Sequence, residues 1–207
     1  MTDLEPTRLS LHAVAELLVA GPQKRDSDTV RLRPVPGGFA TVKTPEASVV
    51  GGDLVTESAS IALDGQTIAD VAAAAGITPF SLSHIHTDST TFTPESLLTV
   101  DLEAAAVLAA AWQVGEDALT RFAPEEERVL WPEHFDVAIA LDEVTYGVSA
   151  GDGFISEPYV YVSPFTKDGL DDEFWNAPFG AATPLADVGD ATAVAAYFMR
   201  GLALRPG

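Results

Sequence analysis

Residues 135–163 read FDVAIALDEVTYGVSAGDGFISEPYVYVS, and this stretch decides the fold class. Its first part alternates in polarity, which predicts a strand whose apolar face is built from Phe135, Val137, Ile139 and Leu141. Residues 144–150 and 158–163 have the same β-type composition and are joined by a glycine-rich loop, GDGFISE. Consecutive strands with short connections indicate an antiparallel sheet.

A second group of short β-type segments lies closer to the N-terminus. The segments TVRLRPV, GFATVK, ASVVGGDLV and SASIAL are punctuated by Gly37-Gly38, Gly51-Gly52 and Asp64-Gly65. They predict an antiparallel meander. The two β groups therefore cover about residues 29–63 and 129–163.

Helical patterns precede, separate and follow these β groups. Apolar spacing predicts a first helix over residues 9–20, which Gly21-Pro22 should end, so that QKRDSD is a loop. Thr67 should cap a short helix closed by Gly76, and Asp190 should cap the last helix. Residues 80–92 alternate polar and apolar side chains, which predicts an extended segment.

The longest helix is expected from Pro94 to Phe122. Apolar residues cover most of its circumference, so it should be central and buried. The order of elements predicts an α+β fold, in which helices pack on one face of a largely antiparallel sheet. Without a convincing linker, residues 1–207 are expected to form a single domain.

Composition narrows the classes of function. The 207 residues carry 31 acidic and 11 basic side chains, a net charge of −20, which disfavours binding to nucleic acid or to anionic membranes. Cysteine is absent from the sequence, which excludes disulfides, thiolate metal sites and cysteine nucleophiles. The N-terminal segment lacks a basic region typical of a secretory signal, so a cytoplasmic location is expected. The oligomeric state stays open.

Ten of the seventeen aromatic residues lie between Trp131 and Phe179. Such clustering is typical of a dense core or of the wall of a ligand pocket. The favoured interpretation is a small-molecule pocket with Asp136 or Glu157 as polar anchors. The candidate ligand-binding residues are Trp131, Phe135, Asp136, Glu157, Tyr159, Tyr161 and Trp175. The alternative is an interaction protein with these aromatic residues in a dimer interface.

LWPEHFDVAI, VSAGDGFISEPYVYVSPF and APFGAATPLADV resemble the C-terminal half of a bacterial family of unknown function. Upstream, SLHAVAELLVAG and LRPVPGGFATV resemble its first helix and its glycine-turn strand. The family's histidine- and tryptophan-rich strand is replaced here by RDSDTVRLRPV. The resemblance implies a shared fold and no known reaction. Its motif residues are Leu11, His12, Gly38, Trp131, Phe135, Asp136, Glu157, Pro158, Tyr159 and Tyr161.

The sequence HIHTD offers a candidate metal site. On an extended strand His84, His86 and Asp88 would project from one face, which is ligand spacing for a divalent metal ion such as zinc. A metal-dependent hydrolase is therefore an alternative function, although no cofactor is required by the favoured interpretation. His12 and Glu16, four residues apart on the first helix, are interpreted as an exposed pair.

Overall fold

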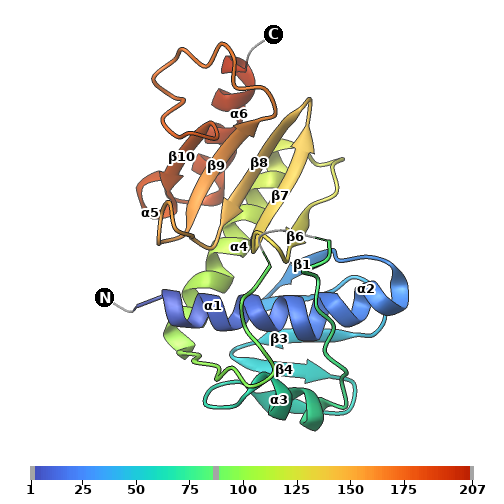
Figure 1. The fold of residues 1–207 in the computed structure, drawn as a ribbon. Helices are drawn as coiled ribbons and strands as arrows, with labels where there is room; N and C mark the ends of the chain where they lie inside the picture. The colour runs from blue at the N-terminus through green and yellow to red at the C-terminus, as the bar shows by residue number, and fades with distance from the viewer. Residues whose placement is uncertain (1–2, 86–88, 206–207) are drawn as a thin grey trace. The chain divides into compact units, whose positions relative to one another are not determined.

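The computed structural model describes residues 3–85 and 89–205 (Figure 1). It confirms the α+β class, because helices accompany strands that pair antiparallel in every recorded register. The chain divides into two compact units, Met1–Ala110 with Leu130–Phe135, and Ala111–Val129 with Asp136–Gly207. The single domain expected from the sequence stays a prediction.

The first unit combines a helical N-terminal segment with a meander of short strands. Its helices are α1 (Glu5–Val14), the π-helix η1 (Ala15–Ala20), α2 (Gly21–Ser27) and α3 (Ile68–Ala75). Its strands are β1 (Leu32–Val35), β2 (Gly38–Thr41), β3 (Ala47–Val50), β4 (Asp53–Thr56) and β5 (Ser60–Ala62). Leu130 of β6 (Val129–Trp131) pairs with Leu32, so the strand order is β6-β1-β2-β3-β4-β5.

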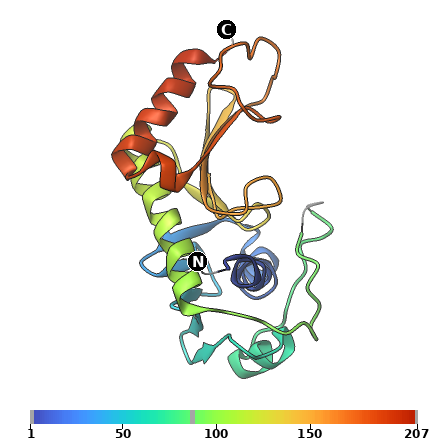
Figure 2. The same ribbon diagram turned by 90° about the vertical axis from the view of Figure 1, so that its left-hand side faces the viewer.

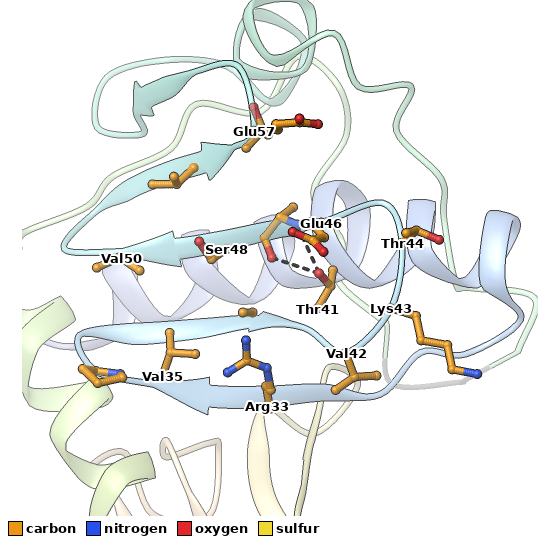
Figure 3. Close-up of a pocket in the computed structure, with 15 residues that line it drawn as sticks. Arg33, Val35, Thr41, Val42, Lys43, Thr44, Glu46, Ser48, Val50 and Glu57 are labelled. Atoms are coloured by element: carbon orange, nitrogen blue, oxygen red, sulfur yellow. Dashed lines mark hydrogen bonds between the residues drawn. The ribbon is translucent and has the colours of Figure 1, made fainter.

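One face of this sheet packs against the N-terminal helical segment. Leu32, Phe39 and Leu54 are fully buried on that face, and β2 and β3 contact η1. Thr67 caps α3 by accepting a hydrogen bond from the Asp70 amide, and Gly76 closes the helix in the left-handed region, as the sequence predicts. The opposite face of β1–β4 is free of these helices (Figure 3).

The first helix does not stop at Gly21-Pro22, and this part of the sequence interpretation is wrong. The helical path widens into η1 and continues through α2 to Ser27. A wider π turn leaves carbonyls without their usual helical partners, and the Leu17 carbonyl accepts a hydrogen bond from the Phe80 amide at 3.1 Å. A Cβ on Gly21 would lie 2.1 Å from the Phe80 carbonyl oxygen, so glycine permits this approach.

The long helix α4 (Leu102–Phe122) starts later than the sequence predicts. Residues 97–101 are held outside it, because their amides bond to the preceding part of the unit. Thr99 and Asp101 donate to Ser10 Oγ and Thr7 Oγ1, both at 2.9 Å. Asp101 then accepts from the Ala104 amide at 2.8 Å, which caps the first turn of α4.

α4 is buried along one side only, so the expectation of a helix buried all round is wrong. Leu108 and Trp112 are almost fully buried, whereas Val107 is 45% exposed. The many alanines explain the misleading pattern, because a small apolar side chain is tolerated on either side of a helix.

The second unit is a meander with strand order β10-β9-β8-β7. Its strands are β7 (Asp136–Leu141), β8 (Val144–Ser149), β9 (Tyr159–Pro164) and β10 (Ala181–Pro184). The first three match the strands expected from the sequence, and β10 was not expected. Two further helices are α5 (Leu185–Val188) and α6 (Ala191–Leu204). The second half of α4 and α6 cover one face of this sheet (Figure 2).

Close backbone approach builds the core of this unit. A Cβ on Gly115 of α4 would lie 2.5 Å from Val137, and a Cβ on Gly201 of α6 would lie 2.8 Å from Val162. Tyr146 and Phe198 are fully buried and meet edge to face. Asp190 caps α6 as predicted, because Oδ1 accepts the amides of Thr192 and Ala193 at 2.9 and 3.0 Å.

Within residues 3–85 and 89–205, no helix combines the length and the apolar character needed to cross a membrane.

Candidate functional site

The structure brings three of the predicted ligand-binding residues together on the sheet face of the second unit opposite Val137. Asp136 pairs with Ser149, which pairs with Tyr159, and Gly147 pairs with Tyr161 in the next row. Residues two apart on a strand share a face, so these side chains gather on one surface. Asp136, Ser149 and Tyr159 are all nearly buried there.

The Tyr161 phenol donates a hydrogen bond to Asp136 Oδ2. The ring lies over Gly147, where a Cβ would come within 2.7 Å of its Cε1 and Oη atoms. Burial and the neighbouring Asp136 carboxylate raise the pKa of Tyr161 well above its ordinary value of 10. The phenol is therefore a neutral hydrogen-bond donor at physiological pH.

Tyr159 fastens the glycine-rich loop to the same surface. Its phenol donates to Asp152 Oδ2 at 2.7 Å, and Asp152 Oδ1 accepts the Phe154 and Ile155 amides. Burial, followed by the hydrogen bond to Asp152, raises the pKa of Tyr159. The hydrogen bonds of Tyr159 and Asp152 therefore give this face of the sheet a structural role, because they hold the glycine-rich loop in place.

The other predicted ligand-binding residues do not join this face. Trp131 and Phe135 belong to the first unit, where the Arg31 guanidinium lies 5.9 Å from the Trp131 ring centre. Glu157 is exposed in the loop before β9. Trp175 packs edge to face on Phe174 with ring centres 4.9 Å apart. Their positions along the chain could not show that these residues lie on separate surfaces.

Phe135 also departs from the predicted strand. It lies in the turn before β7 with a φ of +52°, an uncommon conformation for an aromatic residue. Its ring stacks on His12 at 5.4 Å and meets Phe39 edge to face at 5.6 Å. Phe135 is therefore core of the first unit and does not extend the apolar face of β7.

The candidate metal residues are placed only in part. His84 is exposed in a turn, where its ring meets Phe80 edge to face, so the expected strand is absent at this position. His86 and Asp88 lie outside the described residues. Among the residues that the structure describes, no group of three or more His, Asp or Glu side chains could hold a metal ion.

The interpretation of His12 and Glu16 as an exposed pair is wrong. Glu16 is 1% exposed, and the His12 side chain is 17% exposed. The Thr90 amide lies 3.1 Å from both carboxylate oxygens of Glu16. Spacing along the first helix revealed the pair but could not reveal the segment around Thr90 that covers it.

A groove lies on the free face of the first sheet and was not anticipated from the sequence. It encloses about 640 Å³, within the usual range for small-molecule sites. Small residues form its floor, because Arg33 pairs with Ala40, Ala40 with Ser48, and Ser48 with Val55. Ala40 and Ser48 in the middle of this row are shorter than Arg33 and Val55 at its ends, which hollows the surface.

The groove combines apolar walls with opposite charges. Its lining includes Val35, Val42, Val50 and Val55, of which Val42 is 41% exposed and Val50 37% exposed. Arg33 rises from β1 on one side, and Glu57 lies beyond β4 on the other (Figure 3). Lys43 and Glu46 lie nearer the turn between β2 and β3. Within the described ranges, none of these four charged side chains forms a hydrogen bond or ion pair.

Gln23 of α2 holds one end of the groove in place. This fully buried amide donates to the carbonyls of Thr29 and Arg31, at 3.0 and 2.8 Å. Its oxygen accepts the amides of Val42 and Lys43 at 2.8 and 2.7 Å. The side chain thus satisfies four backbone groups around the start of β1 and the end of β2. The sequence interpretation placed this residue in a loop and missed it.

The fold and the groove define an α+β protein with a polar and apolar hollow on an open antiparallel sheet. Comparisons with protein-family models, curated proteins and solved structures give no match. The resemblance of the sequence to a bacterial family of unknown function stays a prediction.

Proposed function

We propose that the protein binds a small zwitterionic organic molecule in the groove over β1–β4. The observation that supports this proposal is the presence of charges of both signs around one hollow of about 640 Å³, none of which is paired within residues 3–85 and 89–205. Charged side chains on a solvated surface are ordinary. Here, however, they surround exposed valines, and a ligand that covered these valines would gain binding free energy from the apolar surface removed from water. We thus assign the favoured small-molecule function to a different surface from the predicted aromatic wall.

The arrangement of the charges supports a ligand class. Arg33 and Val55 occupy the two ends of a four-strand row, and three strand spacings correspond to about 14 Å. Glu57 lies two residues after Val55. When the side chains of Arg33 and Glu57 extend toward each other, the gap between their charged groups suits a ligand whose own opposite charges are several bonds apart. A dipeptide has this separation, and apolar side chains on it would cover the valines. The guanidinium of Arg33 would bind the carboxylate, because its planar donors match carboxylate geometry.

The test uses amide chemical shifts of the full-length chain during titration with the dipeptide leucyl-leucine. We expect saturable shifts at Ala40, Ser48 and Val50, with an affinity at least tenfold lower for the N-acetylated and for the C-amidated dipeptide. Arg33→Gln should weaken binding of the dipeptide but leave its already weakened C-amidated form unchanged. Glu57→Gln should behave in the same way toward the N-acetylated form.

Two exposed residues of the second unit provide matched controls. Arg121→Gln and Glu125→Gln change the net charge by the same amounts without touching the groove, so they should leave the titration unchanged. Filling the floor with Ala40→Phe should abolish the shifts. The proposal fails if the dipeptide leaves the groove amides unmoved, or if the control variants weaken binding as much as Arg33→Gln and Glu57→Gln do.

A further inference from the structure

Two of the charged residues around the groove have the same sign and face each other. The register of β3 and β4 pairs Ala47 with Thr56. Glu46 and Glu57 are the next residues along these two chain segments, so they lie opposite each other at the same end of both strands. Both side chains line the groove (Figure 3). The groove therefore holds a pair of neighbouring carboxylates at this end.

No ion pair in the described part of the chain neutralises these two carboxylates. Within residues 3–85 and 89–205, neither Glu46 nor Glu57 forms a hydrogen bond or ion pair. The Lys43 side chain extends away from both of them (Figure 3). Like charges directly opposite on neighbouring strands repel each other. A cation bound between the two carboxylates would remove this repulsion.

Glu46 also lies closer to Arg33 than Glu57 does. Arg33 pairs with Ala40, and Ala40 pairs with Ser48, which is two residues from Glu46 on the same side of β3. Two strand spacings and a two-residue step place the Cα atoms of Arg33 and Glu46 about 12 Å apart. One more strand spacing separates Arg33 from Glu57. A ligand whose carboxylate binds Arg33 therefore reaches Glu46 with its ammonium group before it reaches Glu57.

We propose that Glu46 and Glu57 together bind the ammonium group of the ligand, which makes Glu46 a specificity-determining residue of the groove. This role of Glu46 rests on the proposed function and deepens it, because it restricts the ligand to a cation with free N–H groups. A primary ammonium group has three donors, so it can donate to both carboxylates at once. A quaternary ammonium group has the same charge and no donor. The groove should therefore select peptides with a free amino terminus.

The experiment follows the groove amides of the full-length chain during titration with leucyl-leucine and with its N,N,N-trimethyl derivative. We expect the derivative to bind about tenfold more weakly, because it cannot donate hydrogen bonds to the carboxylates. Glu46→Gln should weaken binding of leucyl-leucine more than binding of the derivative, so the preference becomes smaller. Glu95→Gln is the matched control, because Glu95 is exposed in the same unit and lies outside the groove lining.

Urea unfolding of the ligand-free protein at low salt tests the facing pair by a second route. Glu46→Gln and Glu57→Gln should each raise the urea midpoint, because each removes the repulsion between the two carboxylates. The double variant should gain less than the sum of the two single gains, since one repulsion can be removed only once. Strictly additive effects would show that the carboxylates do not face each other, and they would overturn the proposal.

The titration separates failure of this role from failure of the groove function. If leucyl-leucine binds, but Glu46→Gln leaves both its affinity and the preference over the derivative unchanged, the role of Glu46 is wrong and the groove function stands. If leucyl-leucine does not bind, the groove function is wrong, and the role of Glu46 is wrong with it.

Discussion

Tyr161 on β9 donates its phenolic hydrogen to Asp136 on β7, two strands away, across the bare backbone of Gly147 on β8. The bond is possible because the ring occupies the space that a side chain at residue 147 would fill. A single glycine therefore decides whether the buried Asp136 carboxylate and the half-buried Tyr161 can meet.

Gly147→Ala should destabilise the protein by about 1–3 kcal/mol, the usual cost of forcing extra volume into a packed site. The added Cβ would lie 2.7–2.8 Å from atoms of the Tyr161 ring. Urea unfolding measures the change. Gly153→Ala in the neighbouring loop is the control, because a Cβ there meets nothing within 4 Å. Equal unfolding free energies for the two variants would contradict this account of Gly147.

Stability should fall as the pH rises above about 10. The pKa of Tyr161 is raised in the folded state by burial and by Asp136, whereas the unfolded chain loses this proton near pH 10. Above that pH the unfolded state binds fewer protons than the folded state, so unfolding becomes easier by about 1.4 kcal/mol per pH unit for this group. Below pH 10 the contribution is fully present.

Tyr161→Phe removes that proton and should make the alkaline decline shallower by about the same 1.4 kcal/mol per pH unit. Urea midpoints between pH 8 and 11 measure the slope for both proteins. The variant will also be less stable at pH 8, because Asp136 loses a hydrogen bond, so the slopes rather than the midpoints are compared. Identical slopes would show that Tyr161 ionises as freely in the folded protein as in the unfolded chain.

Gln23→Leu should destabilise the protein by about 2–5 kcal/mol, because four backbone groups lose their partner inside the fold. Gln113→Leu is the control, since Gln113 makes an exposed bond to Asp117 at 3.0 Å. Thermal unfolding followed by circular dichroism compares the two. If Gln23→Leu lowers the free energy of unfolding no more than Gln113→Leu does, water must take over the four hydrogen bonds that the Gln23 amide makes to the backbone.

Asp190→Ala should cost about 0.5–2 kcal/mol, because two amides in the first turn of α6 lose their capping oxygen. Asp187→Ala removes an equal charge from nearby α5 without removing a cap, and it should change stability by less than about 0.5 kcal/mol. Chemical unfolding of both variants provides the measurement. If both substitutions cost the same, the effect at residue 190 is one of charge and the capping explanation fails.

Predictions from the local sequence pattern were correct wherever the burial of a residue depends only on the geometry of its own strand or helix. Val137 and Ile139 alternate with smaller residues, and both are buried against the helices, as the strand period of two requires. The caps at Thr67 and Asp190 were predictable because a cap bonds within three residues along the chain. The α+β class follows from such elements.

Prediction failed where a distant segment supplied the deciding contact. The N-terminal helical segment continues beyond Gly21, where the Phe80 backbone packs closely against it. Helix α4 starts later than predicted because the amides of Thr99 and Asp101 donate hydrogen bonds to Ser10 and Thr7. The groove could not be predicted from the sequence for a related reason. The sequence shows that Ala40 and Ser48 are small, but only strand register places them side by side on the face without helices.

By itself, the sequence determined the α+β class, the strands β7–β9 and the capped helices, because these depend on periodicity and on contacts a few residues apart. Tertiary structure alone decided which charged groups are buried. Glu157, which is close to aromatic residues in the sequence, is exposed. Glu16 is buried and accepts a hydrogen bond from the amide of Thr90, 74 residues away. The burial of a carboxylate depends on what surrounds it in space, and that environment is assembled only when distant segments pack.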